Sequence, residues 1–134
     1  MYGVRRSGNR RGLGLYALVV VAGLAPGAAL AAGDAAAGKQ LFTTNCVSCH
    51  GEGGKGDGPV GAALNPKPRN FVEAQFKFDT NKDGKVGTDE DLHNVIKNGA
   101  GAYGGSPLMA PWGGTLSDKD IDNVIAYIRT FHKK

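Results

Sequence analysis

Apolar residues recur at helical spacing in three stretches of this chain. The clearest run lies near the C-terminal end, where five apolar residues stand at positions i, i+3, i+4, i+7 and i+10. They are Ile121, Val124, Ile125, Ile128 and Phe131. This period places all five on one face of a helix, which Ser117 is expected to cap. The pattern therefore predicts an amphipathic helix with one buried face.

A weaker pattern predicts a helix near the start of the folded region. Asp34 is placed to cap it, and its apolar stripe carries Leu41 and Phe42 before the helix reaches residues 46–50. Gly38 lies inside this helix, where glycine costs about 1 kcal/mol relative to alanine. A second backbone is therefore expected to approach closely at Gly38.

A middle helix is predicted over residues 88–98, with Thr88 as its N-cap and Gly99 at its end. Its inward-facing residues are Leu92, Val95 and Ile96. Residues 51–70 and 100–116 are rich in glycine and proline and predict loops. There is no strand-like alternation of useful length and no internal repeat, so the sequence predicts one small all-α domain.

The first 31 residues differ from the rest of the chain. Four arginines at positions 5, 6, 10 and 11 precede the apolar run Leu13 to Ala25, and Ala29-Leu30-Ala31 follows. This order is typical of a secretory signal peptide, with cleavage after Ala31 and a mature domain of residues 32–134 in the periplasm. A retained anchor is the alternative, although the run is shorter than the ~20 residues that a membrane-spanning helix needs. We therefore expect no membrane span in the mature chain.

Loss of the signal segment changes the charge of the chain. It removes four arginines and leaves 12 Lys and Arg against 12 Asp and Glu. A balanced charge offers no strongly basic face, so a nucleic-acid partner is not expected.

The segment Cys46-Val47-Ser48-Cys49-His50 carries the most specific chemistry and contains both cysteines of the chain. Cys-x-x-Cys-His is the attachment sequence of a c-type haem, in which each thiol forms a thioether with a vinyl group and the imidazole binds the iron. On a helix, side chains at i, i+3 and i+4 emerge on one face. A zinc or thiol-redox site would leave His50 unexplained and would lack further ligands.

Met109 is the candidate for the second axial ligand of the iron. It is the only methionine besides Met1, and Pro107 and Pro111 flank it and stiffen the loop that presents its thioether. His93 is the competing ligand, but it lies about 100° around the helix from Leu92, away from the inward stripe. A His/Met pair fills the coordination sphere of the iron, which suits electron transfer and disfavours catalysis.

Two further residues are assigned to the haem environment. The carbonyl of Pro59, or alternatively of Pro66, is predicted to accept a hydrogen bond from Nδ1 of His50. The alternative is that these prolines only stiffen the loop. The indole N–H of Trp112 is predicted either to bond a haem propionate or to lie in an ordinary core.

Residues 79–90 match the twelve-residue calcium loop of an EF-hand at positions 1, 3, 5, 6 and 12. The oxygen donors would be the side chains of Asp79, Asn81, Asp83 and Glu90 and the backbone carbonyl of Lys85. An EF-hand also has an entering helix, which residues 66–78 do not predict. An acidic turn without metal is therefore the alternative to a calcium site that braces the middle helix.

These motifs, taken in order, resemble a class I c-type cytochrome of the bacterial periplasmic kind. The resemblance rests on CVSCH, the Gly-Asp-Gly-Pro loop, the Pro-Leu-Met-Ala-Pro-Trp loop and the Val-Ile-Ala-Tyr-Ile segment of the last helix. It implies a cytochrome c-like fold of three or more short helices wrapped around one covalently attached haem. It also implies that the first and last helices cross, with Gly38, Phe42 and Tyr127 at the crossing. The EF-hand-like loop looks like an insertion into that fold.

The function implied by the resemblance is that of a periplasmic electron-transfer protein. Such a protein carries one electron on a His/Met-ligated haem c, is not an enzyme, and docks transiently with redox partner proteins as a monomer. A dedicated cytochrome subunit of a periplasmic dehydrogenase or reductase is the alternative. A haem sensor or peroxidase would need an open iron position, which ligation by Met109 removes.

Overall fold

The computed structural model describes residues 1, 3 and 32–132, and all structural statements concern these residues. These described residues form four α-helices and two 3₁₀ turns. They are α1 (Ala35–Asn45), α2 (Val47–His50), η1 (Gly61–Ala63), α3 (Asp89–Asn98), η2 (Ala100–Tyr103) and α4 (Asp118–His132). No strand occurs within the described residues, and the predicted all-α class is confirmed.

The predicted signal peptide lies outside the described residues, apart from positions 1 and 3. It therefore stays a prediction. In the part of the chain that the structure describes, no helix is both long and apolar enough to cross a membrane.

The predicted caps begin the three main helices. Oδ1 of Asp34 accepts hydrogen bonds from the amides of Ala36 and Ala37, at 2.8 and 3.2 Å, at the start of α1. Thr88 and Asp91 form a reciprocal capping box at the start of α3. Oγ of Ser117 accepts from the amide of Asp120 at 3.1 Å, at the start of α4. These local bonds satisfy amides that have no partner inside the helix.

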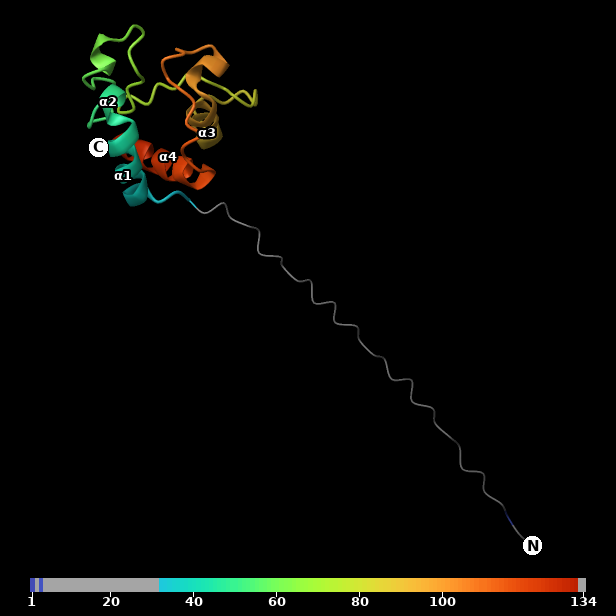
Figure 1. Ribbon diagram of the computed structural model, residues 1–134. Helices are drawn as coiled ribbons and strands as arrows, with labels where there is room; N and C mark the ends of the chain where they lie inside the picture. Colours follow the sequence, from blue (N-terminus) through green and yellow to red (C-terminus); the bar gives the residue numbers. More distant parts are fainter. Residues whose placement is uncertain (2, 4–31, 133–134) are drawn as a thin grey trace.

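Helices α1 and α4 cross in direct contact (Figure 1). A Cβ atom on Gly38 would overlap the backbone carbonyl of Asn123 and would lie 3.0 Å from the amide nitrogen of Val124. Next to this contact, the rings of Phe42 and Tyr127 meet edge to face with centroids 5.4 Å apart. The close backbone approach that Gly38 predicted is confirmed, and α4 supplies the second backbone.

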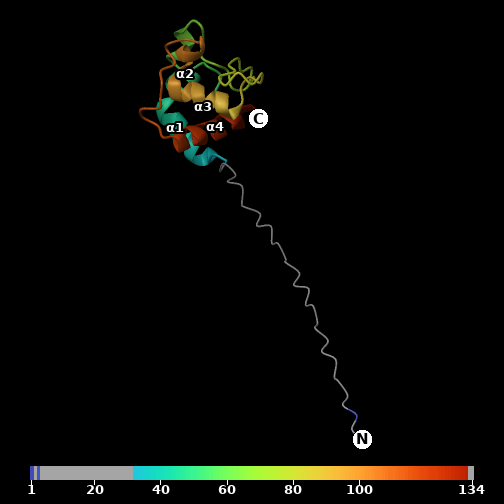
Figure 2. The same cartoon turned by 90° about the vertical axis from the view of Figure 1, so that its right-hand side faces the viewer.

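One hydrophobic core joins the helices. All five residues of the predicted α4 stripe are buried, and they pack in one cluster with residues from α1, α3 and the connecting loops. The other buried members are Phe42, Phe71, Leu92, Ile96 and Leu116. Figure 2 shows α3 lying along α4, so that Leu92 and Ile96 reach this core, whereas Val95 is half-buried.

Candidate functional site

The two cysteines and His50 lie on one helical turn. The helix is interrupted at Cys46, which separates α1 from α2, but the amide of His50 still donates to the carbonyl of Cys46 at 2.8 Å. The amide of Cys49 reaches the same carbonyl at 3.2 Å. Both cysteines are free thiols. The spacing predicted from the sequence is therefore preserved in spite of the break.

Burial sets the protonation of these groups. Burial, together with the nearby Cys49 thiol, raises the pKa of Cys46 to about 11, so this sulfur is a protonated thiol at neutral pH. Burial also lowers the pKa of His50, and the nearby backbone of Arg69 opposes that change only in part. His50 is therefore neutral at physiological pH, and the neutral imidazole is the form that binds a metal.

The predicted hydrogen bond from His50 to a proline carbonyl is not found among the described residues. Nδ1 of His50 is buried and makes no hydrogen bond of acceptable geometry, although the backbone of Arg69 lies close enough to affect its pKa. Pro59 is exposed, and the amide of Val60, the next residue, donates to the carbonyl of Ser48 at 2.9 Å. A place for Pro59 beside the haem stays a prediction without that bond.

Phe71 is a site residue that the sequence did not reveal. Its ring stacks on the imidazole of His50, with centroids 4.7 Å apart and an angle of 18° between the planes. Phe71 follows the proline-rich loop and belongs to no apolar period. The available signal in the sequence was the aromatic side chain of Phe71 at the end of a polar loop.

The loop that carries Met109 is anchored to the end of α3. The carbonyl of Met109 accepts from the amide of Ala100 at 3.1 Å, and its amide donates to the carbonyl of Ser106 at 3.2 Å. The amide of Trp112 donates to the carbonyl of Ile96 at 2.9 Å. Met109 and Trp112 are both half-buried and pack against the common core. The backbone of the Met109 loop is therefore tied to α3 and to η2.

These residues fit a c-type haem. Figure 1 shows α2 and η1 on one side of the upper half of the molecule, and α3, η2 and the orange loop on the other. Cys46 from the first side and Met109 from the second border the same hydrophobic core. Two thiols, a neutral imidazole and a thioether form the donor set for a haem with His/Met ligation.

The EF-hand-like loop is closed by its own hydrogen bonds. The carboxylate of Asp79 accepts from the amides of Asp83 and Gly84, at 3.0 and 2.9 Å. The side-chain amide of Asn81 donates to Glu90 at 3.1 Å. Across residues 32–132, no group of three or more His, Cys, Asp or Glu side chains is arranged to hold a metal ion. The calcium site stays a prediction.

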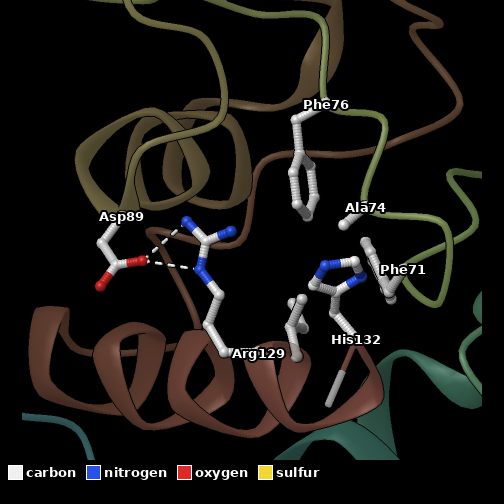
Figure 3. Close-up of a pocket in the computed structure, with 7 residues that line it drawn as sticks. Phe71, Ala74, Phe76, Asp89, Arg129 and His132 are labelled. Carbon is white, nitrogen blue, oxygen red and sulfur yellow. Dashed lines mark hydrogen bonds and ion pairs between the residues drawn. The ribbon is translucent and has the colours of Figure 1, made fainter. Parts of the chain in front are cut away.

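A separate pocket of about 270 Å³ opens beside α4 (Figure 3). Phe71 and Phe76 line it on one side and Arg129 on another, and Arg129 pairs with Asp89 at 2.7 Å. None of the haem-ligand candidates lines this pocket. Phe71 is thus shared between the pocket and the stack on His50.

Comparison with known proteins shows that this chain is similar to cytochromes. The sequence profile of the family described as "Cytochrome C oxidase, cbb3-type, subunit III" matches residues 33–128. Cytochrome c6 of Picosynechococcus is 36% identical over 97 residues, which cover 72% of this chain and 73% of that protein. Cytochrome c-554(547) of Halothiobacillus neapolitanus is 39% identical over 101 residues, covering 74% and 98%.

Two larger proteins also contain a similar region. The cbb3-type cytochrome c oxidase subunit FixP of Bradyrhizobium diazoefficiens is 33% identical over 98 residues, which are 72% of this chain and 27% of FixP. A solved structure of the Kuenenia stuttgartiensis reducing HAO-like protein complex superposes with a TM-score of 0.59 at 34% identity. That match covers 71% of this chain and 41% of the other.

Proposed function

Because the chain belongs to the cytochrome c family, we propose that it is a periplasmic electron-transfer protein that carries one electron on a covalently attached haem c. The observation that carries the proposal is the single helical turn with Cys46, Cys49 and a half-buried, neutral His50. Met109, presented from an anchored loop onto the same core, supports a closed coordination sphere.

Each residue has a defined task in this proposal. Cys46 and Cys49 would hold the haem through thioether bonds, and His50 and Met109 would bind its iron. The bound haem supplies a one-electron ferric/ferrous couple. The hydrogen bonds between the Met109 loop and α3 restrain the thioether, so that little rearrangement accompanies a change of iron charge.

The surface next to the ligand segments suits transient partners. Leu108, beside Met109, is 63% exposed, and Val60, in the loop that folds back on α2, is 51% exposed. Small exposed apolar areas next to polar surface are typical of weak, short-lived redox encounters. We propose transient docking to redox proteins, with the chain itself a monomer and not an enzyme.

Replacement of Met109 tests the ligand set. In holoprotein matured with haem, Met109→Ala should remove the weak red absorption band of a methionine–iron bond and lower the reduction potential. Leu108→Ala is the matched control, since Leu108 is the exposed neighbour and should leave both properties unchanged. An unaltered spectrum in Met109→Ala would show that another group binds the iron.

A dedicated subunit of a larger redox enzyme is the second candidate function. The matches to FixP and to the HAO-like complex favour it, because in both the similar region is part of a larger assembly. Native purification followed by size-exclusion chromatography separates the two. A monomeric peak supports the soluble carrier, and a stable complex with an oxidoreductase supports the subunit. Rapid binding of carbon monoxide to the ferrous protein would instead indicate an open iron position, as in a sensor or peroxidase.

Export to the periplasm rests on the predicted signal peptide. N-terminal sequencing of the exported holoprotein should begin at residue 32, after Ala31. Recovery of the intact N-terminus in the membrane fraction would show that the segment is retained as an anchor.

We also propose that residues 79–90 bind Ca²⁺ weakly as a structural brace. The match of five positions supports this, as does the bond from Asn81 that draws Glu90 toward the loop. With a Kd near the 10⁻⁴–10⁻³ M range of extracellular sites, 10 mM Ca²⁺ should stabilise the holoprotein by about 2 kcal/mol over chelator. Glu90→Gln should abolish this effect, whereas Glu52→Gln, outside the loop, should keep it. Equal melting temperatures with calcium and with chelator would disprove the site.

A further inference from the structure

The stack between Phe71 and His50 is held firmly from the Phe71 side. Phe71 is 7% exposed, and its amide donates to the carbonyl of Gly54 at 2.7 Å. The ring of Phe131 lies 6.3 Å away at an angle of 20°, and that of Phe76 lies 6.3 Å away at 27°. Phe71 is therefore fixed by backbone and ring contacts that do not involve His50.

The imidazole of His50, in contrast, is only weakly restrained by hydrogen bonding. A ligating histidine generally donates its second ring N–H to an acceptor, which fixes the plane of the ring. Here Nδ1 is buried, and its contact with the backbone of Arg69 falls outside the geometry of a hydrogen bond. The close contact of the ring face with Phe71 is the nearest aromatic contact of His50, because the ring of Phe42 lies 6.4 Å away and is tilted by 48°.

We propose that Phe71 is a positioning residue that sets the orientation of the His50 imidazole about its bond to the haem iron. This inference rests on the proposed function, because it takes His50 to be an axial ligand. Near-parallel stacking permits only small rotation of the imidazole before its edge collides with the Phe71 ring. In a ferric haem, the plane of an axial imidazole contributes to the distribution of the unpaired electron.

That distribution can be measured without any activity assay. In the ferric protein, the order and spread of the haem methyl resonances and the g-values of the electron paramagnetic resonance spectrum both depend on the axial ligand planes. Substitution of a residue that contributes only to folding would change the melting temperature and leave these spectra unchanged. The spectra therefore separate positioning from general stabilisation.

The decisive variant is Phe71→Leu, compared with Phe76→Leu. Both substitutions remove a ring from the pocket of Figure 3, but Phe76 has no ring contact with His50. We expect Phe71→Leu to change the order of the haem methyl resonances and the g-values, and Phe76→Leu to keep the wild-type pattern. Phe71→Tyr, which retains the ring, should also keep it. Identical patterns in Phe71→Leu and Phe76→Leu would overturn the proposal.

A second measurement applies even if Phe71→Leu does not fold. In the diamagnetic ferrous wild-type holoprotein, nuclear Overhauser contacts are expected between the ring protons of Phe71 and those of His50, and their absence would refute the stack. These outcomes are independent of the Met109→Ala spectrum, so failure of the Phe71 inference is distinguishable from failure of the proposed ligand set.

Discussion

Asp91 is the buried charged residue that ties the EF-hand-like loop to α3. It is 1% exposed, and its Oδ1 accepts from the amide and the hydroxyl of Thr80 at 2.6 and 2.9 Å. Its Oδ2 accepts from the amide and the hydroxyl of Thr88 at 2.9 and 2.7 Å. Burial acts to raise its pKa, but the bonds from Thr88 and Thr80 outweigh burial and lower the pKa to about 2. Four hydrogen bonds donated to one buried carboxylate favour its ionised form over its protonated form.

This carboxylate makes the stability of the protein sensitive to acid. Because the folded-state pKa of about 2 lies below the ordinary aspartate pKa of 3.8, the ionised group stabilises the fold above about pH 4. That contribution, about 2 kcal/mol, should be lost as the pH falls from 4 toward 2. Asp91→Asn should remove it at all pH values, because an amide cannot accept all four bonds.

Urea unfolding of the two holoproteins at pH 7 and pH 3 measures this effect. The difference between wild type and Asp91→Asn should shrink at the lower pH. Asp120→Asn is the comparison: bonds from Ser117 also lower the pKa of Asp120, but this residue is more exposed, so its pH-dependent difference should be smaller. A difference that does not depend on pH would refute the assignment.

At the scale of elements, two close backbone contacts, each at a glycine, determine how the helices and the Met109 loop are arranged. In the first, α1 lies on α4 at Gly38, where no side chain separates the two helices. In the second, α3 ends at Gly99 with φ of +80°, and a Cβ there would lie 2.9 Å from the carbonyl of Met109. Only glycine combines this backbone conformation with so close a neighbour.

Gly38→Ala should therefore push α1 and α4 apart. The added methyl group overlaps backbone, which cannot rotate away, so we expect a loss of about 3 kcal/mol of stability. Chemical denaturation of the holoprotein measures it. Gly114→Ala, at a position with no atom within 4 Å of the added Cβ, should cost far less. Equal costs at the two positions would contradict the close approach.

Gly99→Ala should act on the ligand loop and not only on stability. Strain at positive φ and displacement of the Met109 carbonyl both move the thioether. We expect a weaker methionine–iron band and a lower reduction potential, read by optical and redox titration. Gly104→Ala is the matched control, because Gly104 also has positive φ but no neighbour within 4 Å. A normal band in Gly99→Ala would show that the loop adapts without moving Met109.

Polar contacts also join α3 to α4. Nδ1 of His93 lies 2.9 Å from Asp122 and its Nε2 lies 3.2 Å from Asp118, while Lys97 reaches Asp118 at 2.7 Å. The sequence predicted that His93 lies off the inward stripe, and the structure agrees, since both ring nitrogens face acidic residues of α4. This arrangement makes His93 a contact between helices and leaves Met109 as the candidate for the second axial ligand.

For the whole molecule, the haem is expected to be part of the core. Cys46, Met109 and Trp112 are partly buried at the edge of the hydrophobic cluster, where the cofactor would complete their packing. A domain of about 100 residues has little stability to spare, so loss of such a group is costly.

Removal of covalent attachment should therefore weaken the fold itself. We expect Cys46→Ala/Cys49→Ala to lack haem and to melt without the sharp transition of the holoprotein, as followed by circular dichroism. The single variant Cys49→Ala, which keeps one thioether, should fall between the two. A double variant that melts like the wild type would show that the polypeptide core suffices.

The sequence alone determined what depends on neighbours along the chain. The attachment turn of Cys46, Cys49 and His50, the helix starts at Asp34, Thr88 and Ser117, and the α4 stripe all follow from short spacings. It also indicated that Gly38 needs a close neighbour, but could not by itself identify Asn123, which lies 85 positions further on.

Only the tertiary structure decided which groups meet across the chain. It brought Phe71 onto His50, left Nδ1 of that histidine without the predicted proline carbonyl, and buried Asp91 among four donors. These contacts depend on how loops without apolar periodicity fold back on the helices. Since a loop's path is fixed by distant packing and not by local preference, no spacing in the sequence could have specified them.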